Sequence, residues 1–358
     1  MNKDNFKIAV ICFFTAYPSV SGSARVCYDF FSCLKIKNKK LFQYSSEGSK
    51  NKKIENIMIK NHTVFKILYL PLLIYKISNF FKKTKKKIIF IEGPSWAFYS
   101  FVLILFFKVF KSDYLVVYRS HSIEYEIRKK NSTSIISFLT FFFEKLILQL
   151  SDIATSVSPY EQRKFYKYYK IKTYLFPNSV SYKKLKNIKI KKIKVPRKYI
   201  FFCGSYLYKP NRKAIDIIIS KILNRIKDLN IKLVLTGGGF KIKNKQIVNL
   251  NILNDSELKY VYKKSLAVVA PIFEGYGTRI KFIEALFYNC NIISTHLGFE
   301  GLKKNKNVFL TNKINSMVKR VIVLNRKKQN KKNTINLDYS MEKNIEIFFK
   351  KYEKKLFN

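Results

Sequence analysis

Apolar residues in this chain occur in short continuous runs, and between the runs they recur at the three- and four-residue spacing of a helix. Such alternation of buried strands and amphipathic helices is typical of α/β proteins with parallel sheets. The runs predict strands at residues 7–15, 87–91, 114–118, 152–158, 199–203, 231–236, 266–270 and 291–295. The helical spacing predicts helices at residues 26–34, 64–81, 97–110, 135–150, from 160, 212–226, 256–264, 278–288, 315–324 and 341–356. The predicted fold is α/β, with two halves that are each a parallel sheet covered by helices on both faces.

A lysine-rich stretch, residues 183–198, separates the two halves. It is irregular and contains Pro196, a composition typical of an interdomain linker. The predicted organisation is a Rossmann-like N-terminal domain at residues 1–182, this linker, and a Rossmann-like C-terminal domain at residues 199–337. Residues 338–358 are predicted to form a C-terminal amphipathic helix that can pack back on the N-terminal domain.

The stretch at residues 266–302 carries the clearest chemical pattern. A strand, a loop with Gly275 and Gly277, a helix and a second strand make a βαβ unit. Such units bind ligands where strand ends meet helix starts.

The helix of this βαβ unit has charges in unusual positions. Glu284 falls on its apolar stripe, where an unpaired charge is costly. Arg279 and Lys281 stand in the first turn, where cations oppose the helix dipole unless an anion binds there. The pattern indicates a bound phosphate, with Glu284 about one turn deeper to accept hydrogen bonds from hydroxyl groups. In the alternative, Glu284 lies at the edge of the stripe and both cations are solvated.

The chain is strongly basic: 70 Lys and Arg against 22 Asp and Glu give a net charge of +48. Coding bias toward lysine is one account, and attraction to an anionic membrane face or to nucleic acid is the other. A hydrophobic content of 47 % argues against disorder. Five cysteines without Cys-x-x-Cys spacing and only three histidines predict free thiols and no metal site.

The apolar stretches at residues 64–81 and 97–110 are too interrupted to span a bilayer. We expect core helices there, with shallow membrane contact as the alternative. The N-terminal apolar run resembles a secretory signal, but a first buried strand is the better interpretation because the order strand, glycine loop, helix recurs along the chain.

Two further strand ends carry candidate chemistry. After the first strand, Gly22 would let a ligand approach the backbone, and Ser23 could cap the next helix. Arg119 and His121 follow another strand at its carboxyl end, where α/β proteins place their ligands. An ordinary serine-glycine loop and a structural histidine are the alternatives.

Residues 275–302, GYGTRIKFIEALFYNCNIISTHLGFEGL, resemble the donor-binding signature of the family 4 (group 1) glycosyltransferases. Weaker similarities to this family lie in GSYLYKPNRKAI (204–215), SHSIEYE (120–126) and EKLILQLSDIATSVSPYE (144–161). The resemblance implies the GT-B architecture, in which two Rossmann-like domains face a cleft. It also implies a glycosyltransferase of the hexosyltransferase type, which uses a nucleotide sugar and retains the anomeric configuration.

The resemblance also implies roles for individual residues. Glu284 would bind the ribose hydroxyls of the donor, while Arg279 and Lys281 hold its diphosphate. The other donor-binding residues would be Gly22, Ser205, Asn211, Gly275, Gly277 and Thr278. His121 and Glu274 are the catalytic candidates, near the reacting sugar.

The N-terminal loop has one glycine where many members of the family have two, and two further positions depart from the family pattern. Nine residues separate Glu274 from Glu284, where most members of the family have seven. Asn289 stands where the family has a glycine at the end of the helix, and asparagine tolerates the left-handed conformation.

The expected function is therefore transfer of a sugar from a nucleotide sugar to an acceptor hydroxyl, without a metal or cofactor. The basic charge and the apolar helices favour a lipid-linked or cell-surface polysaccharide precursor as acceptor, such as lipopolysaccharide, O-antigen or capsule. The enzyme would be cytoplasmic and peripheral on the inner face of the plasma membrane, with no specific nucleic-acid partner. A GT-B nucleotide-sugar isomerase or epimerase and a basic nucleic-acid-binding protein are the alternative functions.

Overall fold

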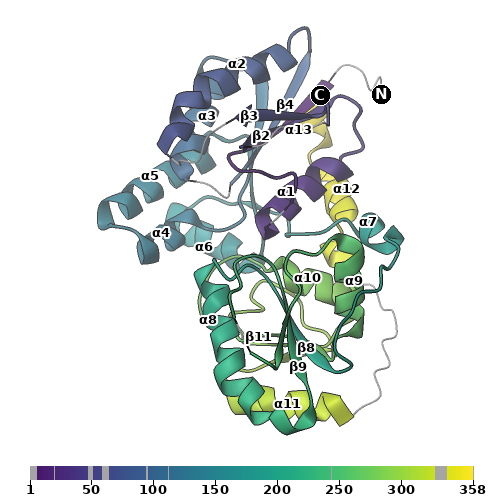
Figure 1. The fold of residues 1–358 in the computed structure, drawn as a ribbon. Helices are drawn as coiled ribbons and strands as arrows, with labels where there is room; N and C mark the ends of the chain where they lie inside the picture. The colour runs from purple at the N-terminus through teal and green to yellow at the C-terminus, as the bar shows by residue number, and fades with distance from the viewer. Residues whose placement is uncertain are drawn as a thin grey trace. The chain divides into compact units, whose positions relative to one another are not determined.

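The computed structural model describes residues 6–19, 21–46, 51–58, 64–93, 96–111, 113–242, 244–326 and 337–357. The chain forms two compact units (Figure 1). Unit 1 comprises Met1–Asn178 and Met341–Asn358, and unit 2 comprises Ser179–Ser340. Each unit contains one sheet of parallel strands, which confirms the α/β class with two parallel sheets.

The sheet of unit 1 has seven strands in the order β3-β2-β1-β4-β5-β6-β7. The strands are β1 (Phe6–Cys12), β2 (Lys39–Ser45), β3 (Ile54–Met58), β4 (Lys86–Glu92), β5 (Tyr114–Arg119), β6 (Ile153–Ser156) and β7 (Tyr174–Leu175). Strands β1 and β4 are neighbours, and the chain winds outward from them in both directions. The carboxyl ends of β1 and β4 therefore form the topological switch point, where open α/β sheets bind ligands.

The helices of unit 1 pack their apolar faces on this sheet. They are α1 (Gly22–Cys33), η1 (Val64–Tyr69), α2 (Leu70–Phe80), α3 (Ala97–Val109), α4 (Glu124–Asn131), α5 (Ser134–Leu150), α6 (Pro159–Tyr169), α12 (Met341–Lys351) and α13 (Glu353–Phe357). Local signals start several of them: the side chains of Thr133 and Ser158 cap α5 and α6, and Pro159 occupies the first turn of α6.

The C-terminal helix α12 belongs to the core of unit 1. Its Phe348 is almost fully buried, with ring centroids 5.4 Å from Tyr174, 5.6 Å from Phe176 and 6.0 Å from Phe90. Helix α12 thus packs on the sheet of unit 1 and covers part of one face.

Unit 2 has a six-stranded parallel sheet in the order β10-β9-β8-β11-β12-β13. Its strands are β8 (Tyr199–Cys203), β9 (Lys232–Thr236), β10 (Ile247–Asn249), β11 (Ala267–Ala270), β12 (Ile292–Ser294) and β13 (Val308–Leu310). Here β8 and β11 are the neighbours from which the chain winds outward in both directions. The switch point of unit 2 lies at their carboxyl ends.

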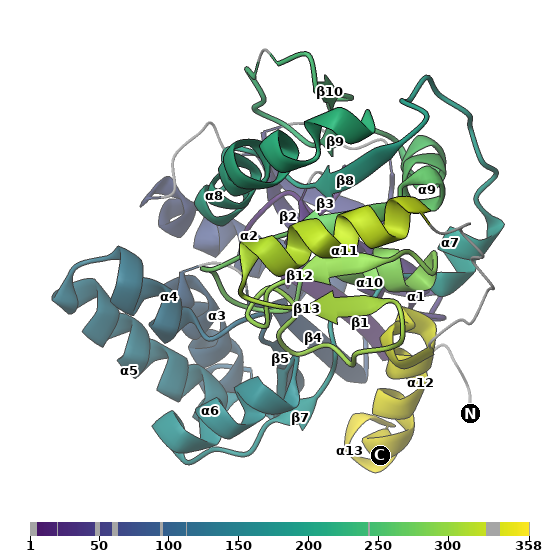
Figure 2. The ribbon, with the colours of Figure 1, turned by 90° about the horizontal axis from the view of Figure 1, so that it is seen from below.

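Helices flank the sheet of unit 2, with α8 and α9 on opposite sides of its strands in Figures 1 and 2. The elements are α7 (Tyr182–Asn187), α8 (Lys209–Ile217), η2 (Ile218–Ile222), η3 (Leu223–Arg225), η4 (Lys227–Leu229), α9 (Asp255–Lys264), α10 (Ile280–Phe287), α11 (Ile314–Arg326) and η5 (Leu337–Tyr339). A full capping box starts α9: the Asn254 side chain accepts from two backbone N–H groups, and Glu257 reaches back to the Asn254 N–H.

Several elements differ from the sequence predictions. Strands β2, β3, β7, β10 and β13 were not predicted. The helix predicted at residues 212–226 begins earlier, at Lys209, and its second half is a π-helix followed by a 3₁₀ turn. Residues 183–198 lie in unit 2, and most of α7 falls within them.

Two other expectations can be compared directly. All five cysteines are free, as their spacing predicted: Cys12, Cys27, Cys33, Cys203 and Cys290. No helix in the described part of the chain is both long enough and apolar enough to cross a membrane.

Candidate active site

The switch point of unit 2 brings two separate stretches of the sequence together. Strand β8 leads into the loop before α8, and the adjacent β11 leads into the glycine loop before α10. Parallel neighbours end at the same edge, so Ser205 and Asn211 lie beside the loop that carries Gly275 and Gly277.

Asn211 links the two stretches through its side-chain amide. Its Nδ2 donates to the Ser205 carbonyl at 3.0 Å, and its Oδ1 accepts from Lys281 Nζ at 2.9 Å. Gly204 has a φ of +148°, and a Cβ there would come within 2.7 Å of Asn211 Nδ2 and 3.1 Å of Lys281 Nζ. The close approach therefore requires glycine at this position.

Lys281 is held in a poorly solvated position. Its Nζ lies 3.9 Å from the ring centroid of Phe202 and forms no salt bridge with any carboxylate of the described residues. Burial lowers the pKa of Lys281 to about 7, with Cys203 opposing that shift and Arg279 adding to it. An anion bound nearby would restore the favourable charged state, because opposite charge raises the pKa of an ammonium group.

The loop before α10 leaves the start of this helix without a side-chain cap. Gly275 and Gly277 have φ angles of +106° and +75°, which glycine adopts without strain. Arg279 is the N-cap residue of α10 and donates to the Gly277 carbonyl, but no side chain caps the helix and its first turn has no acidic residue. The Thr278 hydroxyl oxygen is buried with no hydrogen-bond partner among the described residues. Such a helix start is a ready anion site.

Glu284 lies inside unit 2, with only 5 % of its surface exposed. Its Oε2 is 3.1 Å from the Tyr262 hydroxyl, which is also 3.1 Å from the Lys281 carbonyl oxygen. Burial, with added contributions from Cys203 and Glu284, raises the pKa of Tyr262 well above its usual value, so the hydroxyl remains a donor. The solvated alternative for Glu284 is excluded by this burial.

Glu274, one of the two catalytic candidates, pairs with Lys213 of α8. Its Oε2 lies 2.7 Å from Lys213 Nζ, and Oε1 is buried without a hydrogen-bond partner among the described residues. The carboxylate thus has one oxygen still able to accept a hydrogen bond.

In unit 1, Gly22 is the exposed first residue of α1. Ser21, rather than the predicted Ser23, caps this helix: its hydroxyl accepts from the Ala24 N–H at 3.2 Å. The difference arises because α1 begins four residues earlier than predicted. The loop before it is fixed by Gln43, whose Oε1 accepts from the N–H groups of Ala16 and Tyr17, both at 2.9 Å.

His121, the other catalytic candidate, belongs to a buried ionic cluster at the carboxyl ends of β4 and β5. Glu92 receives a hydrogen bond from Arg119 on one oxygen and contacts His121 Nε2 with the other. The Arg119 guanidinium lies between Phe30 and Phe176, 3.8 Å and 4.7 Å from their ring centroids. Burial alone would raise the pKa of Glu92, but Arg119 and His121 together hold it below its ordinary value.

Glu92 fixes the orientation of His121. With an ionised Glu92 at Nε2, that nitrogen carries the proton, and Nδ1 of neutral His121 is left as an acceptor. Sequence reasoning missed Glu92, although Glu92 and Arg119 are paired in register as the last residues of adjacent strands.

A pair of buried carboxyl groups, Glu124 and Glu144, supports the segment after His121. Glu144 of α5 accepts from the Glu124 N–H at 2.8 Å and the Tyr125 N–H at 3.2 Å, and so caps α4. The Tyr169 hydroxyl donates to it at 2.6 Å. Burial and the neighbouring carboxyl raise the pKa of Glu124 to about 8, and burial raises that of Glu144 to about 7 despite these hydrogen bonds.

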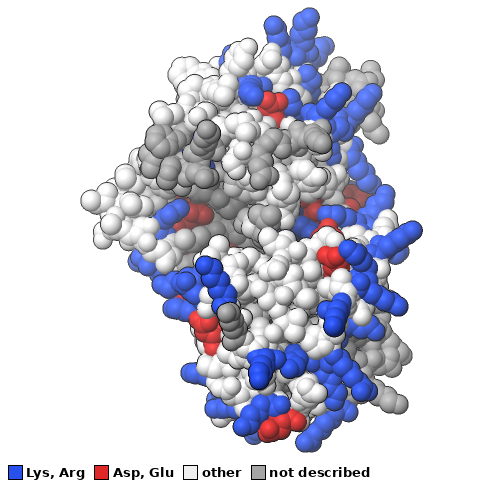
Figure 3. All heavy atoms as spheres, viewed as in Figure 1, with Lys and Arg blue, Asp and Glu red and all other residues white. Residues whose placement is uncertain are grey.

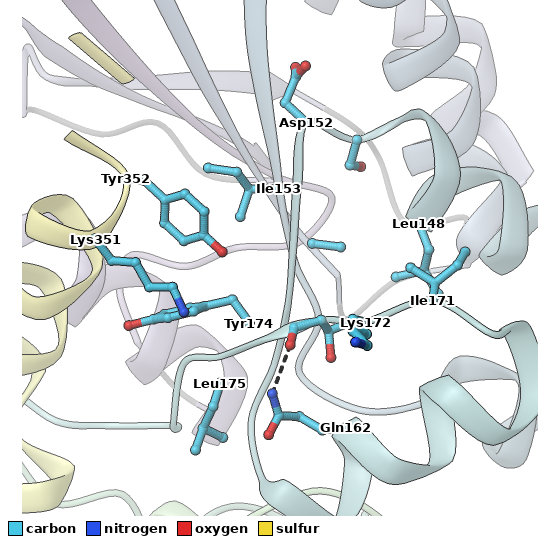
Figure 4. Close-up of a pocket in the computed structure, with 13 residues that line it drawn as sticks. Leu148, Asp152, Ile153, Gln162, Ile171, Lys172, Tyr174, Leu175, Lys351 and Tyr352 are labelled. Carbon is cyan, nitrogen blue, oxygen red and sulfur yellow. Dashed lines mark hydrogen bonds between the residues drawn. The ribbon is translucent and has the colours of Figure 1, made fainter. Parts of the chain in front are cut away.

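A cavity of about 490 Å³ lies elsewhere in unit 1, between β6, β7 and α12 (Figure 4). Tyr174, Tyr352 and Lys351 line it together with Gln162, which donates to the Thr173 carbonyl at 2.8 Å. None of the residues predicted for the site lines this cavity. Within the described ranges, no three His, Cys, Asp or Glu side chains gather in a way that could hold a metal ion.

Part of the chain matches a known family model. The family model described as "Glycosyl transferases group 1" matches residues 197–326, which include every donor-binding residue predicted in unit 2. No curated protein matches the chain.

Solved structures resemble nearly the whole chain. Sucrose-phosphate synthase from Thermosynechococcus elongatus has a TM-score of 0.72 at 12 % identity, over 98 % of each chain. Anabaena HepE in complex with UDP and glucose has a TM-score of 0.70 at 11 % identity, over 97 % of this chain and 99 % of that one. The UDP-GlcNAc 2-epimerase from Methanocaldococcus jannaschii has a TM-score of 0.58 at 13 % identity, over 96 % and 99 %. At such identities the likeness establishes the fold, which is GT-B.

Proposed function

We propose that the chain is a glycosyltransferase that moves a sugar from a nucleotide-diphosphate sugar to an acceptor hydroxyl. The match of residues 197–326 to the glycosyl transferases group 1 model and the GT-B fold support this proposal. The observation that carries the donor assignment is Lys281, desolvated over Phe202 and joined through Asn211 to the loop after β8. A diphosphate seated on the start of α10 would supply the anion that this lysine lacks.

The proposed chemistry follows from these contacts. Arg279 and Lys281 stabilise the negative charge that develops on the leaving diphosphate, and preorganised charge of this kind is commonly the largest contribution to catalysis. Glu284, buried and supported by Tyr262, accepts hydrogen bonds from the ribose hydroxyls. His121 and Glu274 act on the reacting sugar, with retention of configuration, as the resemblance implies. Cations do this work without a metal.

HepE, which has a similar fold, forms complexes with UDP-glucose and with UDP and glucose, which supports a nucleotide sugar as the donor here. For the acceptor, we infer a lipid-linked or cell-surface polysaccharide precursor, such as one for lipopolysaccharide, O-antigen or capsule. The support is a net charge of +48 together with exposed apolar helices in unit 1. The enzyme would then work at the cytoplasmic face of the membrane, drawn to its anionic lipids.

The donor site is tested by nucleotide release from a panel of nucleotide sugars. A true donor also raises the melting temperature by mass action, which selects the sugars to assay. Glu284→Ala and Arg279→Ala should each abolish release, whereas Lys264→Ala, an exposed lysine at the end of α9, should not. Full activity in both site variants would remove the donor assignment.

A second candidate function is isomerisation of the nucleotide sugar, since an epimerase shares this fold. Product analysis separates the two: an altered free nucleotide sugar indicates the isomerase, and a new glycosidic bond indicates the transferase.

A further inference from the structure

We propose that the outward faces of α3 and α5 in unit 1 form a docking surface for a bilayer that contains anionic lipids. The proposal rests on the membrane association proposed above and names the surface that makes it. The apolar face, as we call it, consists of Leu105, Val109, Phe110, Ile135, Ile136, Phe138 and Phe142.

The side chains of the apolar face are exposed and are not part of the buried core of unit 1. Ile135 is 73 % exposed, Phe110 70 % and Phe138 67 %. On α5, Ile135, Phe138 and Phe142 recur at helical spacing and so point in one direction. Contiguous exposed apolar patches of this kind mark interaction sites in soluble proteins.

Ring contacts pack the two helices against each other. Phe143 of α5 stacks on Phe101 of α3, with ring centroids 5.1 Å apart, and its ring centroid lies 5.0 Å from that of Phe98. Phe142 in turn lies 5.9 Å from Phe143. In Figures 1 and 2, α3 and α5 lie side by side, and the outer end of α5 is a white surface in Figure 3. These contacts place α3 and α5 next to each other in unit 1.

The charge around the apolar face fits an anionic bilayer. Residues 96–111 and 134–143 contain no Asp or Glu, and the carboxylate of Glu144 is turned into the core. Exposed lysines stand at the edges: Lys111 follows α3, Lys129 and Lys130 precede α5, and Lys145 lies further along it. Apolar side chains that enter the headgroup region with lysines around them are the pattern of interfacial membrane helices.

The single tryptophan provides a probe. Trp96 is the N-cap residue of α3, and its ring centroid lies 5.1 Å from that of Phe98. A second copy of the chain would meet the same lysines as like charges, which opposes self-association.

The test uses the full chain and vesicles of phosphatidylcholine with or without phosphatidylglycerol. The triple variant Ile135→Ser, Phe138→Ser and Phe142→Ser should lower the partition coefficient on anionic vesicles by at least about tenfold, since three exposed apolar side chains are removed. The control variant Ile252→Ser, at a residue 66 % exposed in unit 2, should bind as the unchanged protein does. Brominated lipids should quench Trp96 in the unchanged protein and not in the triple variant.

Two outcomes overturn the proposal: vesicle binding that survives the triple substitution, and a dimer in solution that the triple variant converts to monomer. Release of nucleotide from the donor is measured on the same variant without lipid. Retained release with lost vesicle binding supports the surface. If the unchanged protein releases no nucleotide from any donor, the proposed function fails. Vesicle binding by the unchanged protein and the triple variant still tests the docking surface.

Discussion

The two sheets share one winding but differ in the electrostatics at the carboxyl ends of their strands. In unit 1, Arg119 and His121 follow one another at the end of β5, and both bind the buried Glu92 at the end of β4. In unit 2, the partners of Lys281 Nζ among the described residues are an amide oxygen and an aromatic ring. The carboxyl edge of the sheet has the same topology in both units. The units differ in whether a buried carboxylate neutralises the positive charge at that edge.

The comparison teaches how to distinguish a scaffold from a ligand site of the same topology. An ionic cluster whose charges are paired internally positions its own members, here His121, without attracting a charged ligand. A cation left without a carboxylate at a helix start attracts one. Removing charge should therefore damage stability in unit 1 and binding in unit 2.

The largest effect is expected from Glu92→Gln. It leaves Arg119 and His121 without their buried anion, and breaking such a pair costs about 3–5 kcal/mol of stability. Urea unfolding measures this cost. The control Glu55→Gln removes a more exposed carboxylate, paired with Lys40 and Lys76, and should cost about 1 kcal/mol or less. Equal effects of the two changes would mean that the unit 1 cluster is not a closed buried pair.

The same cluster predicts a pH dependence. The pKa of Glu92 is lowered in the folded state, so its contribution to stability is present above the ordinary carboxyl pKa of about 4.3 and is lost as the pH falls below it. Glu92→Gln should therefore show less acid destabilisation than the unchanged protein.

In unit 2, Lys281→Met should leave the fold intact and lower kcat/KM for the donor by about 10²–10³, the usual effect of removing one preorganised charge donor. Lys264→Met is the matched control. If the variant kept full activity but melted at a much lower temperature, Lys281 would be part of the scaffold, and the contrast with unit 1 would fail.

A fourth prediction concerns Glu124, whose pKa is raised to about 8 in the folded state. An acid with a raised folded pKa contributes its full stability below the unfolded pKa of about 4.3, and that contribution falls as the pH rises toward 8. Glu124→Gln should remove this slope and make the variant about 1–3 kcal/mol more stable than the unchanged protein near pH 8. Parallel stability profiles from pH 5 to 8 would contradict the assignment.

The smallest effect is a pH dependence of nucleotide affinity. Lys281 has a pKa of about 7 in the free protein, so binding of UDP should weaken as the pH rises through this value, by at most about tenfold per pH unit. Calorimetric titration at several pH values measures it. Lys281→Arg, which stays charged, should bind UDP with a flat profile, and a flat profile in the unchanged protein would exclude Lys281 as the phosphate ligand.

The sequence predicted most of the fold because its strands are continuous β-branched runs. Strand β2 was not predicted because the buried polar residues Gln43 and Ser45 break its apolar pattern. Strands β10 and β13 have three residues each, too few for a period to be visible. Asn289 has a φ of +54°, which confirms the left-handed conformation inferred at the end of α10.

In the candidate site, residues that stand out by their local sequence pattern could be predicted, and residues that matter through their neighbours in space could not. Lys281 and Glu284 stand out because their charges conflict with one helix, and that conflict is visible in sequence. Glu92 and Phe202 could not be found in this way, because a sequence does not state which strands are adjacent. The link from Asn211 to Lys281 spans two strand ends and depends on the same adjacency.

The position of α12 has a consequence for biosynthesis. Phe348 completes a cluster with Phe90 and Phe176, yet it leaves the ribosome only after all of Ser179–Ser340. At about 5–20 residues per second, the nascent first unit waits roughly ten to thirty seconds with that apolar side uncovered. Chaperone demand during translation should therefore peak while the second unit is being made.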